Sequence, residues 1–172
     1  MTRLRRIEDR DRIFFVTTNL ARKVAPLIPK ESDLILAAIE KQRLNADFLL
    51  FGYVVMPTHV HLLFSPQNQN LIQIMRDMKS KTGYAIAQRR IVAGPIWQER
   101  YFDTIIRRVR DFWQELEYIH CNLVEAGLVE NPEDWRWSSY KHYVKKGEVP
   151  IAVDPVELSS DGEHFLWPAP WR

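Results

Sequence analysis

The chain has 172 residues, of which 46% are hydrophobic and 12% aromatic, and its formal net charge is +2. That length and composition can build one compact core, and no run approaches the roughly 18 apolar residues of a membrane span. The charged first residues do not resemble an export signal. The single cysteine, Cys121, excludes an internal disulfide and a Cys-x-x-Cys zinc site, so we expect a cytoplasmic protein.

The hydrophobic pattern alternates between strands and helices. In chain order it predicts a strand, a helix, two strands, a helix, a strand and a helix, over residues 12–18, 33–45, 48–56, 59–65, 70–90, 101–108 and 111–126. Ser32 is a suitable N-cap for the first helix, Asn70 opens the second, and Gly127 ends the last. The nearly unbroken apolar run over 48–56 indicates a buried central strand. This order predicts an α+β fold of the ferredoxin-like kind, an antiparallel sheet with helices on one face.

Two histidines lie two positions apart in the strand predicted over 59–65. Alternate side chains of a strand share a face and are about 7 Å apart, so the imidazoles of His59 and His61 can converge on one metal ion. Ordinary surface histidines are the alternative, and the spacing alone leaves it open. Imidazoles on a strand this apolar need polar partners, which favours a site.

The last predicted helix carries a second polar pair. Its apolar stripe is Phe112, Leu116, Ile119, Leu123 and Ala126. Tyr118 and Asn122 lie four positions apart on a neighbouring face, so a phenol and an amide can point at the same spot. The alternatives are a boundary tyrosine with a wet hydroxyl and an asparagine that caps the helix end.

Charge is distributed unevenly along the chain. Between Arg76 and Arg110 there are nine Lys or Arg against three acids, whereas residues 111–134 hold seven acids and no Lys or Arg. A second group of arginines lies at the N-terminus. Local positive surface of this kind binds phosphate, although solvated basic helix faces would give the same pattern.

Four ordered motifs resemble the REP-associated tyrosine transposases, which belong to the IS200/IS605-like single-tyrosine HUH nucleases. They are Met-Pro-Thr-His-Val-His-Leu-Leu (56–63), Trp-Gln-Glu-Arg-Tyr-Phe-Asp (97–103) with Ile-Arg (106–107), Tyr-Ile-His-Cys-Asn (118–122) followed by Val-Glu-Ala-Gly-Leu-Val (124–129), and Trp-Arg-Trp-Ser-Ser-Tyr (135–140). The resemblance spans roughly residues 14–143.

The resemblance implies a role for each matched residue. His59 and His61 correspond to the paired histidines that hold a divalent metal, Mg²⁺ or Mn²⁺, and Tyr118 corresponds to the nucleophile. Asn122 corresponds to the polar residue that completes the metal site. Thr58 stands where relatives often have asparagine, and Leu123 stands where they usually have proline, which leaves the direction of the Asn122 side chain open.

The activity implied is a metal-dependent single-stranded DNA endonuclease and strand transferase that acts at REP-type hairpins through a 5′-phosphotyrosine intermediate. The partner would be single-stranded DNA that contains such hairpins. The protein would be cytoplasmic and associated with the nucleoid, and we expect no membrane partner. We expect the phosphates to be bound by basic side chains, namely Arg5, Arg6, Arg76, Lys79, Arg107, Arg108 and Arg110. Some members of the wider group are dimers that share sites; we favour a monomer and keep the homodimer as an alternative.

The composition changes near the C-terminus. We predict a transposase domain over residues 1–147 and an acidic tail over 148–172 that contains prolines together with Trp167 and Trp171. The tail could be a disordered acidic end, but its aromatic residues suggest that it docks onto the body, where it could cover the DNA groove.

Two other functions remain open. A non-catalytic hairpin-DNA binding protein or repressor would need the same basic surface but neither Tyr118 nor the metal. A replication initiator or relaxase with the same chemistry is disfavoured by the short chain and the lack of a helicase domain.

Overall fold

The computed structural model describes residues 12–144 and 147–156. Its elements, in chain order, are β1 (Ile13–Asn19), α1 (Pro29–Leu44), β2 (Phe48–Val55), β3 (His59–Pro66), α2 (Leu71–Arg90), β4 (Phe102–Ile106), α3 (Val109–Glu125), the 3-10 helix η2 (Pro132–Asp134) and α4 (Tyr140–Val144). No helix in these described segments is long and apolar enough to cross a membrane.

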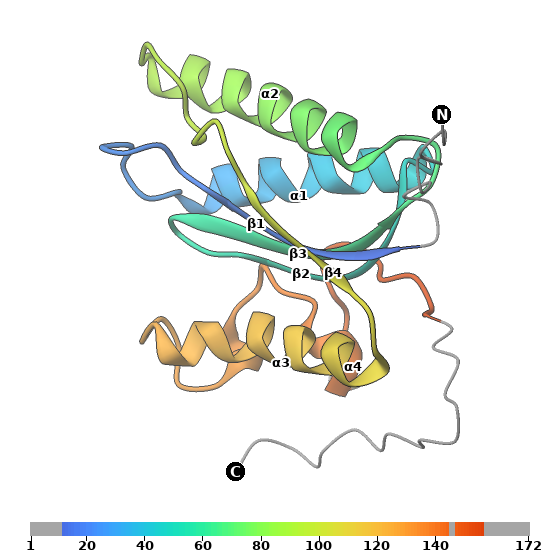
Figure 1. Cartoon of the computed structure of the whole chain (residues 1–172). Helices are drawn as coiled ribbons and strands as arrows, with labels where there is room; N and C mark the ends of the chain where they lie inside the picture. Colours follow the sequence, from blue (N-terminus) through green and yellow to red (C-terminus); the bar gives the residue numbers. More distant parts are fainter. Residues whose placement is uncertain (1–11, 145–146, 157–172) are drawn as a thin grey trace, which may run out of the picture.

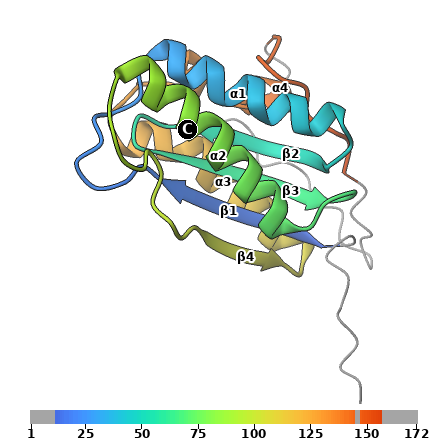
Figure 2. The ribbon, with the colours of Figure 1, turned by 90° about the horizontal axis from the view of Figure 1, so that it is seen from above.

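The four strands form one antiparallel sheet in the order β2-β3-β1-β4, which Figure 2 shows from above. This strand order and the βαββαβ succession confirm the predicted α+β, ferredoxin-like class. β1 and β3 are the two central strands. The histidine pair of β3 therefore lies in the middle of the sheet.

The helices cover both faces of the sheet, as Figure 1 shows. α1 and α2 pack against one face, over side chains such as Leu62 and Phe64. α3 packs against the other, over Phe15 and Leu63. The expectation of helices on one face thus holds for α1 and α2 only. The apolar strands present hydrophobic side chains to both sides, so a third helix can bury its own stripe on the second face.

The helix starts follow capping chemistry. α2 begins as predicted after Asn70, whose Oδ1 accepts a hydrogen bond from Gln73 N at 2.9 Å. α1, however, begins at Pro29, and the expected N-cap Ser32 is buried within its first turn. Proline is favoured in the first turn of a helix because its missing N–H is not needed there, and the sequence prediction had placed this proline in a loop.

A partly buried ion pair joins α2 to α1. Arg90 Nη2 lies 2.5 Å from Glu31 Oε2, and Arg90 Nε donates to Glu31 Oε1 at 2.7 Å. The same guanidinium donates to the carbonyls of Ala25 and Pro26. The hydrogen bond from Arg90 lowers the pKa of Glu31, against the opposing effect of burial. One arginine of the basic segment is therefore structural.

β2 lies at one end of the strand order. Its apolar run had indicated a central strand, so the observed position differs from the expected one. Its outer edge is nevertheless covered. Val55 N donates to Trp137 O, and Ser139 N donates to Tyr53 O, so the Trp-Arg-Trp-Ser-Ser-Tyr motif runs along β2. This covering explains why β2 is as hydrophobic as a central strand.

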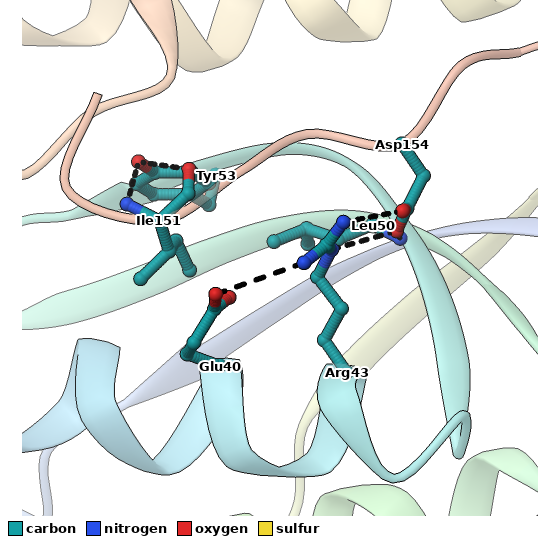
Figure 3. A network of polar contacts seen from close by, with 6 residues as sticks. All are labelled: Glu40, Arg43, Leu50, Tyr53, Ile151 and Asp154. Carbon is teal, nitrogen blue, oxygen red and sulfur yellow. Dashed lines mark hydrogen bonds and ion pairs between the residues drawn. The ribbon is translucent and has the colours of Figure 1, made fainter. Parts of the chain in front are cut away.

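Residues 150–154 cover the rest of that edge. Figure 3 shows Asp154 accepting hydrogen bonds from Arg43 and from Leu50 N, while Tyr53 and Ile151 contact each other through Tyr53 Oη. Ile151 and Val153 are buried in the core. Packed residues therefore continue beyond residue 147, where the sequence predicted the start of the tail. Trp167 and Trp171 lie outside the described residues.

The position of α3 is set by a close approach to β2. The register of β2 against β3 shifts between Leu50 and Gly52, so Phe51 and Gly52 both face α3. A Cβ at Gly52 would lie 2.6 Å from Leu116 Cδ1. Because Gly52 has no side chain, α3 can lie close to the sheet, with Phe112, Leu116, Ile119 and Leu123 buried as predicted; Ala126 is exposed.

Candidate nucleophile and metal site

The residues predicted to form the site lie together on the α3 face of the sheet. His59 and His61 come from β3, and Tyr118 and Asn122 come from the C-terminal half of α3. The ring centroids of His59 and His61 are 4.7 Å apart, and those of His61 and Tyr118 are 5.4 Å apart. The structure therefore unites two pairs that are separated by more than fifty residues of sequence.

His61 is held from three sides. Its Nδ1 lies 2.8 Å from Thr17 Oγ1, its Nε2 lies 2.8 Å from Asn122 Nδ2, and its ring stacks on Phe15 at 5.5 Å between centroids. An amide nitrogen can only donate, so Nε2 accepts and the ring proton resides on Nδ1, which donates to Thr17. This tautomer directs the Nε2 lone pair toward Asn122 and α3.

Both histidines of the pair are neutral at pH 7. Burial lowers the pKa of His61 to about 3, with a smaller contribution from His59. Burial also lowers the pKa of His59. A histidine binds a metal through an unprotonated nitrogen, so these shifts leave the lone pairs available for a ligand.

Thr58 contacts the half-buried His59. Thr58 Oγ1 lies 3.1 Å from His59 Nδ1, so the opposite nitrogen, Nε2, is the one oriented to bind. Thr58 thus supplies a hydrogen-bonding group beside the histidine.

Tyr118 is accessible to a large substrate. Its side chain is 45% exposed although its ring packs edge-on against both His61 and Phe15. A tyrosine that only stabilised the core would have its ring covered, whereas this ring is fixed on one side and open on the other. Such a side chain is both oriented and reachable.

The donor set could hold a divalent cation: Mn²⁺ or Mg²⁺ if water and phosphate oxygens complete the coordination, or Zn²⁺, for which imidazole is a stronger ligand. His59 and His61 offer two neutral imidazole nitrogens, and a turn of the Asn122 amide would present its oxygen beside His61. Among the residues that the structure describes, no group of three or more His, Cys, Asp or Glu is arranged so that it could hold a metal ion. The set is therefore incomplete by itself and leaves positions for water and phosphate oxygens.

The predicted phosphate-binding residues are divided between the two faces. Arg107, Arg108 and Arg110 are exposed at the junction of β4 and α3, and Arg108 pairs with Asp111 at 2.9 Å. Arg76 and Lys79 lie on α2, across the sheet from His61, and Lys79 Nζ donates to Glu99 O at 2.6 Å. Arg5 and Arg6 lie outside the described residues.

Sequence reasoning missed the two β1 residues that support the site. Phe15 and Thr17 pair across the strands with Leu63 and His61, so they share the face of the histidines. Their alternation with the core residues Phe14 and Val16 was visible in the sequence. Only the pairing of β1 with β3 shows that this alternation places Phe15 and Thr17 on the face of the histidines.

Comparisons with known proteins agree with this arrangement. The model of the family described as "Transposase IS200 like" matches residues 16–122, more than half of the chain and the part that holds all four site residues. The class is thus a transposase. The chain belongs to the IS200-like transposase family, an enzyme family, as the four motifs predicted.

Two relatives cover nearly the whole chain. The REP-associated tyrosine transposase of Escherichia coli (strain K12) is 27% identical over 170 residues, which are 96% of this chain and 99% of that protein. A solved structure of a REP-associated tyrosine transposase bound to a REP hairpin is 25% identical, with a TM-score of 0.70 over 97% of this chain and all of the other. The likeness to these proteins therefore extends beyond the residues that the family model matches.

Proposed function

We propose that this protein is a metal-dependent single-stranded DNA endonuclease and strand transferase that acts at REP-type hairpins, with Tyr118 as its nucleophile. The observation that carries the proposal is the union of Tyr118, His59, His61 and Asn122 on one face of the sheet, with the tyrosine exposed. The hairpin-bound relative supports the choice of substrate.

The reaction begins with attack by Tyr118 Oη on a phosphodiester of the DNA backbone. The bond from Oη to phosphorus forms as the bond from phosphorus to the 3′ oxygen breaks. The phenolic proton passes to solvent, and the departing oxygen takes up a proton to become a free 3′-hydroxyl. The product is a 5′-phosphotyrosine. Because the phosphodiester energy is kept in this linkage, a 3′-hydroxyl can reverse the step and join a strand without ATP.

The side chains around the tyrosine position the reactants. Phe15 and His61 hold the Tyr118 ring against the sheet, which fixes the approach of its hydroxyl. Thr17 holds His61 in the tautomer that offers Nε2. A divalent cation, Mg²⁺ or Mn²⁺, bound by His59, His61 and Asn122 would neutralise charge on the phosphate and favour the ionised phenol.

The exposed arginines that follow β4 are suited to the DNA backbone. Arg107 comes directly after β4, and Arg110 lies in the first turn of α3, the helix that carries Tyr118. They carry no ion pair with any described residue and are available for phosphates. Arg108 would have to exchange Asp111 for a phosphate.

The test is a covalent-adduct assay. End-labelled single-stranded hairpins with randomised unpaired flanks are incubated with the full chain and Mn²⁺, then denatured. A labelled protein band is expected for the wild type and for Tyr84→Phe, a control at a tyrosine that is 70% exposed on α2. It should be absent for Tyr118→Phe, which should still bind the hairpins. Binding by the wild type without any adduct would indicate a non-catalytic hairpin-binding protein instead.

A further inference from the structure

Phe102 is a large apolar side chain left exposed on an edge strand. It is 60% exposed, and it packs into neither of the two hydrophobic clusters. Its strand, β4, lies at the end of the sheet opposite to β2. The edge of β2 is covered by later segments, whereas the β4 end carries exposed side chains at Phe102 and Thr104.

The register of the sheet places Phe102 beside the candidate site. Phe102 pairs with Thr17, and Thr17 pairs with His61, so these three side chains form one row across β4, β1 and β3 on the α3 face. Two strand spacings separate Phe102 from His61, on the order of 10 Å. The next row joins Thr104 to Phe15, which contacts Tyr118.

The exposed ring of Phe102, in the same row as His61, favours a ligand that carries flat apolar groups. The nearest charged residues in sequence are of both signs, since Arg100 is exposed two residues before Phe102 and Glu99 and Asp103 are exposed as well. Single-stranded DNA combines a phosphate backbone with unpaired bases, and aromatic side chains beside basic groups are the usual platform for such bases. A duplex would not suit this position, because its bases are stacked on one another.

We propose that Phe102 is a stacking platform for an unpaired base of the DNA strand whose phosphodiester reaches Tyr118. The inference rests on the proposed function and adds a binding residue to it. A base fixed on Phe102 would align the backbone across Thr17 toward the histidine pair. The platform would act on many sequences, because every base has an aromatic face.

The experiment measures binding without cleavage. The full chain carrying Tyr118→Phe is used to select the most strongly bound hairpin from a library with randomised unpaired flanks. Phe102→Leu and Phe102→Tyr are then added in that background, together with Tyr84→Leu as the matched control on the far face. Affinity is measured for the selected hairpin and for copies with one abasic site at each flank position.

We expect the loss of DNA affinity to depend on which flank position lacks its base. Phe102→Leu should weaken binding about 5- to 100-fold, and Phe102→Tyr and Tyr84→Leu should change it less than about threefold. An abasic site at one flank position should weaken DNA binding by the parent protein. The same abasic site should cause no further loss of affinity in Phe102→Leu, because both changes remove the same stacking contact. Melting temperatures within about 2 °C of the parent would show that the exposed substitutions leave the fold intact.

Three outcomes would overturn the inference. They are unchanged affinity with Phe102→Leu, an abasic profile identical in parent and variant, and a change in self-association that accounts for the whole effect. The adduct assay with the wild type on the same hairpin separates the two proposals. If an adduct forms but the effect of Phe102→Leu is the same at every abasic position, the stacking platform is rejected and the nuclease is kept. If one abasic position depends on Phe102 but no adduct forms, the nuclease is rejected and the platform is kept.

Discussion

The two faces of the sheet are built for different purposes. The face under α1 and α2 is closed by apolar packing, and the buried carboxylate of Glu31 is neutralised by the partly buried Arg90. The face under α3 carries buried His61 but leaves Tyr118 and Phe102 exposed. Side chains on the first face should therefore govern stability, and those on the second should govern chemistry.

The largest expected effect is at His61. His61→Ala removes the buried imidazole at the centre of the site, so the rate of adduct formation per folded molecule should fall at least about 100-fold. The measurement is a single-turnover adduct assay at several Mn²⁺ concentrations. A variant that keeps the wild-type rate would show that the histidine pair takes no part in the reaction.

Arg90 tests the closed face. Arg90→Ala leaves the Glu31 carboxylate buried without its partner, so the free energy of unfolding should fall by about 3 kcal/mol. Urea unfolding gives this quantity, with Lys81→Ala, an exposed lysine on the same helix, as the control. Adduct formation per folded molecule should be unchanged. If Arg90→Ala lost activity while keeping the wild-type stability, the proposed division of stability and chemistry between the two faces would be wrong.

Thr17 tests the support of the metal site. Thr17→Val removes the hydrogen bond to His61 Nδ1, so the concentration of Mn²⁺ needed for half-maximal adduct formation should rise about 10- to 100-fold. Thr17→Ser keeps the hydroxyl and should restore the wild-type value. Equal behaviour of the valine and serine variants would rule out this positioning role.

The smallest effect is the pH dependence that Glu31 confers. Its pKa is lower in the folded protein than its ordinary value of 4.5, so the ionised carboxylate stabilises the fold above that pH. This stabilisation is lost as the pH falls through the folded-state pKa. Glu31→Gln should be less stable at pH 7 but should lose less stability between pH 4.5 and more acidic values, as urea unfolding at each pH would show. If the free energies of unfolding of the wild type and Glu31→Gln changed with pH in parallel, this prediction would be contradicted.

Local spacing predicted much of the site. The two-residue separation of His59 and His61 and the four-residue separation of Tyr118 and Asn122 each gave a shared face, because strand and helix periods fix those directions. The elements also followed the hydrophobic pattern, with small differences at their ends. These features depend on neighbours in the sequence.

What the sequence left open depends on contacts between distant segments. α3 packs on the face opposite α1 and α2, where Gly52 and the register shift beside it let Leu116 approach β2. The covering of β2 by Trp137 and Asp154 made an edge strand resemble a central one. Thr17 could be linked to His61 only through the pairing of their strands.

The most direct test of the central claim is to identify the amino acid that becomes linked to DNA. The adduct formed by the wild-type chain is digested with a protease and a nuclease, and the nucleotide-bearing peptide is sequenced by mass spectrometry. We predict a single nucleotide phosphate on Tyr118. A nucleotide on any other residue, or an adduct that persists in Tyr118→Phe, would contradict the account.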